Sequence, residues 1–370
     1  MKIDSRVKEI YHILHAIPEV GFSEHKTSAY LAGELAKAGY AVRTGIGGTG
    51  VTGVLDSGVP GPVIGLRGDM DALLHTVDGA EKCVHSCGHD AHSAMVLAAA
   101  EALAEQPPAK GAIKIIFQPA EEKLFGALSM IEAGAVDDLD ILAGIHLRPI
   151  QEAKSGQATP ALCHGASYIV EAAVKGAPAH GARPHLGVNA IDAAAAVVGA
   201  VNAIRLNPVE SWSVKTTKLQ AGGPTLNAIP DLAAMAFDLR AQSNAIMDSL
   251  LAKLPQVIEH AAAAIGATAA ITIKGGVPAA EYDQDMVAVA REAIRAVLGD
   301  QGVLDPIVTP GGEDFHYFVK KNPKLKPAYL GLGCDLTPGL HHPDMRFDLD
   351  ALPKGVAILC EFVRRAAALS

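Results

Sequence analysis

The densest group of chemically active side chains in this sequence is the ten-residue stretch CVHSCGHDAH, from Cys83 to His92. It contains two cysteines, three histidines and one aspartate, which are side chains that bind transition metals or transfer protons. Four interpretations are open: a structural zinc site, a redox pair, part of a catalytic metal site, or chance clustering. Residues elsewhere in the chain must decide among them.

The spacing of the cysteines argues against two of these interpretations. A structural zinc site usually takes four ligands from two CxxC-like pairs, whereas Cys83 and Cys87 have CxxxC spacing and no second pair follows. A thioredoxin-like redox site requires CxxC, which is also absent. The five cysteines are scattered along the chain, so we expect them to be mostly reduced. Cys87 and His89 flank Gly88, and on a turn both side chains could converge on one ion.

Acidic and imidazole side chains follow three short apolar runs, GPVIGLRGD, GAIKIIFQPAEE and LDILAGIHLRP. The first run leads into Asp69 and Asp71, the second into Glu121 and Glu122, and the third into His146. Because ligands of open α/β sheets collect at the carboxyl ends of the strands, we expect these groups at one rim, together with the CGHD stretch. This convergence favours a catalytic metal site.

Each acidic residue also has a simpler interpretation. One member of the adjacent pair Glu121 and Glu122 could bind a metal while the other acts as general base, or the pair could begin a solvated helix. Asp69 and Asp71 could orient an imidazole ligand, or they could cap a helix or brace a loop. Asp90 is expected to be the N-cap of the helix DAHSAMVLAAAEALAEQ and to orient its neighbours.

The histidines outside the dense stretch are ambiguous on their own. His146 ends an apolar strand, where a core or capping histidine is the alternative to a ligand. His341 and His342 lie in the Gly/Pro turn GLHHPD, where an ordinary surface loop is the alternative. Thiolate, imidazole and carboxylate ligands together would suit Zn, Co, Ni or Mn.

The length and the hydrophobic pattern predict an α/β chain with two domains. At 370 residues the chain exceeds what one core usually supports. Two helical segments, separated by a break at residues 18–21, precede the first strand. The apolar runs lack clean alternation and are separated by helical segments, which predicts a mostly parallel sheet covered on both faces.

An insert with a different pattern begins near Gly165. Segments such as SYIVEAAVKG and DLAAMAFDLRAQ alternate like half-exposed strands, and helices are expected near 188–205 and 244–265. The order β-α-β-β-α-β predicts a ferredoxin-like α+β domain over 165–276. The first pattern resumes after about Gly276, so the first domain is predicted to be discontinuous, over 1–164 and 277–370.

Composition and charge exclude several classes of protein. The net charge of −9 is spread along the chain without a Lys/Arg block, so no nucleic-acid partner is expected. No apolar run reaches the roughly 18 residues of a membrane span, so no membrane partner is expected. The charged start MKIDSRVKEI has no apolar signal region. We therefore expect a cytoplasmic protein.

The motifs together resemble those of a known family. They are RGDMDAL, HSCGHDAHSAM, IFQPAEE, GIHLRP, GAPAHGARPHLGVNAID, LNAIPD, DLRA, GGEDF and GLHHPDMRFD. The set is similar to the two-metal aminoacylase/carboxypeptidase metallopeptidases, especially the hippurate hydrolases, N-acyl-amino-acid amidohydrolases and indole-acetyl-amino-acid hydrolases. The resemblance is colinear from HAIPEVGFSEHKTS to FDLDAL, which is nearly the whole chain.

The resemblance implies two divalent metal ions per subunit, which could be Mn, Zn, Co or Ni. The ligands that it implies, with Cys87 bridging the ions, are Cys87, His89, Glu122, His146 and His341. The family pattern of Leu, His, any residue and Pro favours His341 over His342. Glu313 and Asp314 match the EDF motif and are expected to line the site.

The resemblance also implies roles for residues outside the metal ligands. Glu121 matches the general base, which takes a proton from the attacking water and passes it to the leaving amine. His180, in the insert, matches a histidine that reaches a neighbouring subunit's site and stabilises the oxyanion. Asn227 and Arg240 match positions near the substrate carboxylate, although polar residues at strand ends on the insert's surface are the alternative. The insert would then be a lid and dimerisation domain, in a homodimer or a higher homo-oligomer.

The chain departs from the family pattern at residues 72–86. This loop is several residues shorter than usual, and Leu74 stands where the family has proline. The loop borders the substrate pocket, and His75, Cys83 and His85 are expected at the pocket edge rather than among the ligands. Specificity is the property that this departure should change most.

The leading functional hypothesis is hydrolysis of the amide bond in a small N-acyl or N-aroyl amino acid, or in a peptide-like amide. The second hypothesis keeps the metals but cleaves another C–N bond, such as that of an aryl amine. The third is a metal-dependent small-molecule binding protein without catalysis. Glu121 argues against the third, because a protein that only binds would be expected to lose the base.

Overall fold

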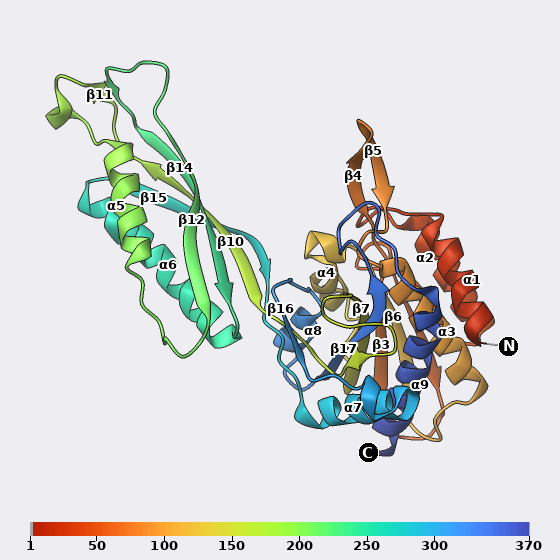
Figure 1. The fold of residues 1–370 in the computed structure, drawn as a ribbon. Helices are drawn as coiled ribbons and strands as arrows, with labels where there is room; N and C mark the ends of the chain where they lie inside the picture. Colours follow the sequence, from red (N-terminus) through yellow and green to blue (C-terminus); the bar gives the residue numbers. More distant parts are fainter. Residues whose placement is uncertain (1–2, 370) are drawn as a thin grey trace. The chain divides into compact units, whose positions relative to one another are not determined.

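The computed structural model describes residues 3–369, which fold as two compact units (Figure 1). The smaller unit consists of His164–Ala280 with Pro310–Gly312, and the larger unit comprises the rest. Each unit has its own hydrophobic core, so each is described separately.

A seven-stranded sheet forms the centre of the larger unit. Its strands in spatial order are β1 (Ala41–Ile46), β2 (Gly50–Asp56), β6 (Ala112–Gln118), β3 (Val63–Asp69), β7 (Ile141–Pro149), β17 (Lys326–Leu336) and β8 (Ala158–Thr159). The four strands from β6 to β17 run parallel, whereas β1, β2 and β8 pair antiparallel with their neighbours. The sheet is therefore mixed, with a parallel centre and antiparallel edge strands that were not predicted from the sequence.

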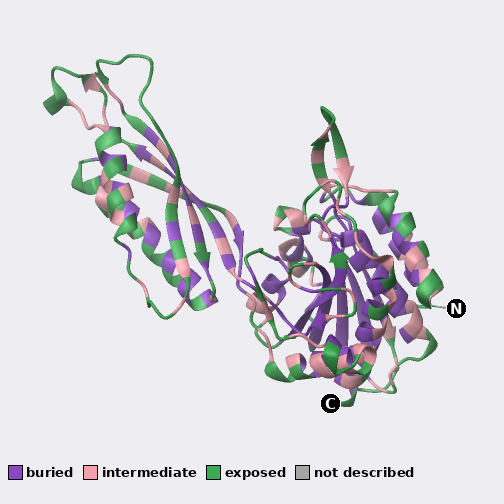
Figure 2. Ribbon diagram, in the orientation of Figure 1, coloured by how far each residue is buried: buried purple, intermediate pink, exposed green. Residues whose placement is uncertain are grey.

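Helices cover both faces of this sheet (Figure 1). One face and its outer layer hold α1 (Ile3–His15), α2 (His25–Lys37), α3 (His89–Glu105), α7 (Gln284–Leu298) and α9 (Leu352–Ala368). The short helices α4 (Gly126–Glu132) and α8 (His316–Lys321) lie against the other face. Figure 2 shows that the central strands are buried between these layers, which explains why their sequences are apolar on both sides.

The smaller unit is an antiparallel sheet with two helices. Its elements in chain order are β10 (Ala166–Lys175), α5 (Ala190–Asn202), β12 (Trp212–Ala221), β14 (Leu232–Ala241), α6 (Asn244–Ala264) and β15 (Thr268–Val277). The spatial order β12-β14-β10-β15 is that of a ferredoxin-like motif. Both helices pack on one face, so alternate strand residues are buried while the other face is open.

The segment at residues 72–86 is an exposed two-stranded hairpin. Its strands are β4 (Leu73–Val77) and β5 (Ala80–Val84), joined by Asp78 and Gly79. Both turn residues have positive φ, 53° and 76°, which is the geometry of a type I′ turn.

Among residues 3–369, no helix has the length and apolar character that a membrane span requires.

The separate cores predict that a core mutation destabilises mainly its own unit. Replacing the buried Phe237 with alanine removes a large side chain from the core of the smaller unit, which should lower its free energy of unfolding by about 3–5 kcal/mol. The only tryptophan, Trp212, lies in that unit, so its fluorescence in a urea titration should report the shift. The matched variant Phe362→Ala, in the core of the larger unit, should leave the tryptophan midpoint in place. An equal shift in both variants would show that the units unfold together.

Candidate metal centre

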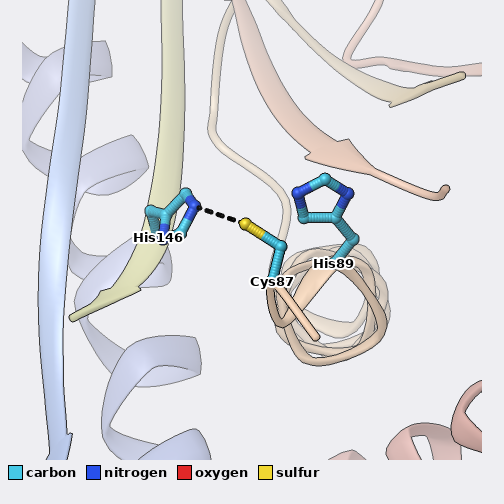
Figure 3. A group of neighbouring side chains, drawn as sticks. All are labelled: Cys87, His89 and His146. Atoms are coloured by element: carbon cyan, nitrogen blue, oxygen red, sulfur yellow. Dashed lines mark hydrogen bonds between the residues drawn. The ribbon is translucent and has the colours of Figure 1, made fainter. Parts of the chain in front are cut away.

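The start of α3 and the end of β7 bring Cys87, His89 and His146 together (Figure 3). The Cys87 Sγ atom lies 3.7 Å from the His146 Nε2 atom, and the thiol sits between the two imidazole rings. One ligand atom from each residue lies within 4.8 Å of the others, and all three side chains are buried. Such a group can hold one metal ion.

A second group shares Cys87 with the first. Its members are Cys87, Glu122 and His341, again with ligand atoms within 4.8 Å of one another. The His341 Nε2 atom lies 3.2 Å from the Glu122 Oε1 atom. All five predicted ligands therefore converge, and the shared thiol stands where a bridging ligand would. His341 and its competitor His342 are both exposed, but His342 lies outside this group and accepts a hydrogen bond from the Asp344 N–H group.

The histidine rings are oriented so that one nitrogen faces this centre. The Nδ1 atom of His146 contacts the Leu147 carbonyl oxygen at 2.6 Å, so Nδ1 carries the proton and Nε2 presents a lone pair. The Nδ1 atom of His89 lies 3.1 Å from Asp71 Oδ1, which favours the same tautomer. Among the described residues, the buried His89 Nε2 atom has no hydrogen-bond partner. Unpartnered buried polar atoms require an explanation, and a divalent cation supplies one.

The charges at the centre also fit a cation. Burial raises the pKa of the Cys87 thiol to about 12, and the nearby Glu122 adds to this rise. A nearby cation lowers a thiol pKa, so the thiolate that ligates a metal would form together with binding. Burial likewise raises the pKa of Glu121 well above its usual range, with Glu313 and Asp314 as further causes.

Asp71 connects the ligands to the strand ends. Besides the His89 ring, its carboxylate accepts hydrogen bonds from the Glu121 and Glu122 backbone N–H groups at 3.1 and 3.0 Å. Asp71 therefore fixes an imidazole and the adjacent glutamate pair at once. Asp69 instead accepts a hydrogen bond from His92 Nδ1 at 2.8 Å, and the Nε2 atom of that ring accepts one from the Leu147 N–H group.

The structure corrects the prediction for Asp90. The N-cap of α3 is Gly88, with φ of 90°, and Asp90 is the second residue of the helix. The left-handed glycine makes the turn that places Cys87 and His89, and the helix begins directly after it. The Asp90 carboxylate contacts His15 Nδ1 at 2.7 Å and accepts a hydrogen bond from its neighbour's N–H group, so it orients α1 rather than capping α3.

A buried arginine beneath the centre was not identified from the sequence. Arg67, on β3, is 1% exposed and forms ion pairs with Asp69, with Glu313 at 2.9 Å and with Asp314 at 3.3 Å. Burial raises the pKa of Asp314 to about 8, although this arginine lowers it, and the neighbouring Glu313 adds to the rise. Asp314 also accepts hydrogen bonds from the Gln118 side chain and the Ala127 N–H group. An arginine inside an apolar run such as GPVIGLRGD was the available signal, since a buried charge must be paired.

The residues predicted near the substrate all lie in the smaller unit. His180 is exposed on the short strand β11 (Ala179–His180), beside β13 (Ala228–Ile229), and its Nδ1 atom accepts a hydrogen bond from Ala182. Asn227 is exposed, and its main-chain carbonyl oxygen accepts a hydrogen bond from the Gly181 N–H group. Arg240 is half-exposed and pairs with Asp238 at 2.7 Å. The roles of His180, Asn227 and Arg240 toward a substrate stay predictions.

The hairpin at residues 72–86 is tied to one of the ligands. The His75 Nε2 atom lies 2.7 Å from the Ser86 hydroxyl, and the Ser86 carbonyl oxygen accepts a hydrogen bond from the His341 N–H group at 2.6 Å. Cys83 is half-buried on β5, outside both ligand groups, while His85 is buried below it. The base of the hairpin therefore reaches the metal centre through the main chain.

The two cysteines of the opening stretch provide a matched test of the metal centre. We expect Cys87→Ala to lower the metal content of the purified protein to below half of the wild-type value, because this thiol belongs to both ligand groups. Cys83→Ala, four residues earlier, should keep the wild-type metal content. Inductively coupled plasma mass spectrometry after dialysis measures both. Full metal content in Cys87→Ala would contradict the assignment.

Comparison with known proteins gives one family and several close relatives. The family model described as "Peptidase family M20/M25/M40" matches residues 65–365. The chain is 32% identical to the N-acetyl-L-cysteine deacetylase of Bacillus subtilis (strain 168), covering 95% of this chain and 86% of that protein. It is 31% identical to the hippurate hydrolase of Campylobacter jejuni, covering 94% and 93%. A solved structure, a dinuclear metal binding peptidase of the M20 family from Bacillus subtilis, superposes with a TM-score of 0.82 at 26% identity and covers 99% of both chains.

Proposed function

We propose that this chain, a hydrolase of the peptidase family M20/M25/M40, cleaves the amide bond of a small N-acyl or N-aroyl amino acid. The observation that carries this proposal is the convergence of five ligand side chains beside Glu121, a buried carboxylate. The relatives support the substrate class, because one is named for N-acetyl-L-cysteine and another for hippurate, an N-aroyl amino acid.

We propose that the five ligands hold two divalent cations, with Cys87 shared between them. The mixed thiolate, imidazole and carboxylate donors suit Mn, Zn, Co or Ni. When bound, such ions polarise a carbonyl group and lower the pKa of water. Asp71 would keep the His89 ring and the glutamate pair in place as ions bind, since it already contacts all three.

The proton transfers are assigned to Glu121. Its Oε2 atom lies 3.8 Å from the unpartnered His89 Nε2 atom, so the carboxylate borders the ligand cluster. A buried carboxylate with a raised pKa can accept a proton from the attacking water and give it to the leaving amine. No nucleophilic serine or cysteine is required for this hydrolysis.

Replacement of Glu121 by glutamine tests the proposed reaction. Glutamine keeps the size of the side chain but cannot accept the proton, so we expect kcat to fall by about 10²–10⁴-fold, the usual contribution of general acid–base catalysis. The assay is the release of free amine from a panel of N-acetyl, N-benzoyl and other N-acyl amino acids. An aryl amine panel run in parallel tests the alternative C–N bond.

Metal content decides how this result is interpreted. Glu121 also belongs to two further groups that could hold a metal ion, one with His89 and Glu122 and one with Glu313 and Asp314. If Glu121 is the base and not a ligand, Glu121→Gln should retain the wild-type metal content. Wild-type protein that holds metal and turns over no N-acyl amino acid would contradict the proposed substrate class. Unchanged turnover in Glu121→Gln would contradict the assigned base.

We also propose a homodimer through the smaller unit, in which His180 serves the partner's site and Asn227 and Arg240 contact the substrate carboxylate. The supporting observation is that β12 is an edge strand whose residues are mostly exposed. An unpaired edge can pair with a second copy of the same strand. His180 is exposed, which an oxyanion donor acting on another subunit requires. A cytoplasmic location stays a prediction.

Mixing two inactive variants tests the action of His180 on the partner's site. His180→Ala and Glu121→Gln homodimers should each be inactive. A random mixture of the two chains should recover about a quarter of the wild-type activity, because half of the dimers would contain one site with both residues intact. The mixture is made by coexpression with two affinity tags, and its mass is measured by light scattering. A fully active monomer, or a mixture without recovery, would contradict the proposal.

A further inference from the structure

The segment that carries Glu121 and Glu122 has an unusual backbone. Ala120 and Leu124, on either side of the single turn Glu121–Lys123, have φ of 52° and 59°. Residues with a Cβ atom rarely adopt this left-handed conformation, and it persists only where surrounding contacts fix it. The direction in which the two glutamates project therefore depends on what holds this segment.

Two buried carboxylates hold three consecutive N–H groups of the segment. Asp71 accepts hydrogen bonds from Glu121 and Glu122, as described above. The Oε1 atom of Glu24 accepts a hydrogen bond from the Ala120 N–H group at 2.8 Å, across 96 positions of the sequence. The segment is thus fixed from two directions by acidic side chains.

The Glu24 side chain forms its hydrogen bonds with this segment and with Thr49, and not with the helix that Glu24 precedes. It occupies the N-cap position of α2, yet its side chain makes no capping hydrogen bond. Instead it is fully buried, and its second oxygen accepts a hydrogen bond from the hydroxyl of the buried Thr49. Close packing supports the same contact, because a Cβ atom on Gly21 would lie 2.8 Å from the Ala120 Cα atom. Burying a carboxylate is costly unless its oxygens find donors, and both oxygens of Glu24 do so outside α2.

We propose that Glu24 is a positioning residue of the hydrolytic site, which fixes the left-handed conformation of Ala120 and thereby aims Glu121. This inference rests on the proposed role of Glu121 as general base. For this role, the Glu24 side chain must be long enough for an oxygen atom to accept the hydrogen bond from the Ala120 N–H group. The negative charge of the carboxylate is not required.

Two conservative variants distinguish the effect of the length of the Glu24 side chain from the effect of its charge. Glu24→Gln keeps the length, so its amide oxygen can accept from Ala120 and its amide NH₂ group can donate to Thr49. Glu24→Asp keeps the charge but is one methylene too short to reach Ala120. We expect Glu24→Gln to stay within a few-fold of wild-type kcat and Glu24→Asp to lose about 10²-fold in kcat, the effect of a catalytic group displaced by about 1 Å, with little change in KM.

Amide hydrogen exchange gives a readout that does not depend on activity. In peptides that cover residues 119–124, we expect exchange about tenfold faster in Glu24→Asp than in the wild type, and unchanged exchange in Glu24→Gln. If Glu24→Asp does not fold, Thr49→Val takes its place, because it removes the donor that holds the second Glu24 oxygen. That variant should show the same changes to a smaller degree, and wild-type kcat and exchange in it would then overturn the proposal.

The outcomes distinguish this inference from the proposed function. Glu24→Asp with wild-type kcat and exchange, or Glu24→Gln as inactive as Glu121→Gln, would overturn the role of Glu24. If wild-type protein turns over no substrate, the proposed function fails, and the exchange measurement still decides whether Glu24 fixes the segment. Metal content is measured for every variant, so that a loss of metal is not mistaken for a displaced base.

Discussion

The larger unit is organised around the cost of burying carboxylates, each of which needs donors once water is removed. Asp69 receives its donors from Arg67 and His92, and Asp71 receives them from His89 and two backbone N–H groups. The sequence satisfies nearly every buried acid around the strand ends in this way. The buried His89 Nε2 atom, by contrast, faces the ligand cluster without a hydrogen-bond partner among the described residues, and a cation would satisfy it. The site is therefore a place where hydrogen bonds within residues 3–369 leave a buried polar atom without a partner.

The backbone around the centre also departs from regular geometry. Among the described residues, six that are not glycine have positive φ, and four of them border this region: Phe22, Ala120, Leu124 and His341. The N–H group of Ala120 is bonded to the buried Glu24 carboxylate, whereas those of Leu124 and His341 are bonded to the main-chain carbonyl oxygens of Glu121 and Ser86. Such conformations persist only where surrounding contacts stabilise them.

Much of the site could be predicted from the sequence because it lies at the ends of apolar strands. The strand-end rule predicted that Glu122 and His146 lie near the CGHD stretch, whereas the full ligand set, with His341, was implied by the family resemblance. The structure brings the five side chains together. The antiparallel edge strands were missed because β1 is mostly exposed and neither β1 nor β2 is a continuous apolar run. The hairpin at residues 72–86 could have been predicted, because the dipeptide Asp78–Gly79 is typical of a two-residue hairpin turn. Gly88 was not predicted as the N-cap of α3 because aspartate, as at position 90, is a preferred N-cap residue. The reach of Glu24 to Ala120 had no local signal, because it joins segments 96 positions apart.

The hydrogen bond from the His341 N–H group to the Ser86 carbonyl oxygen has an evolutionary consequence. It anchors a ligand through main-chain atoms, which every residue type except proline provides alike. The outer part of the hairpin, from Leu73 to Val84, can therefore accumulate substitutions while the anchor is inherited unchanged. A lineage could therefore change the sequence of this hairpin while the main-chain position of His341 is kept.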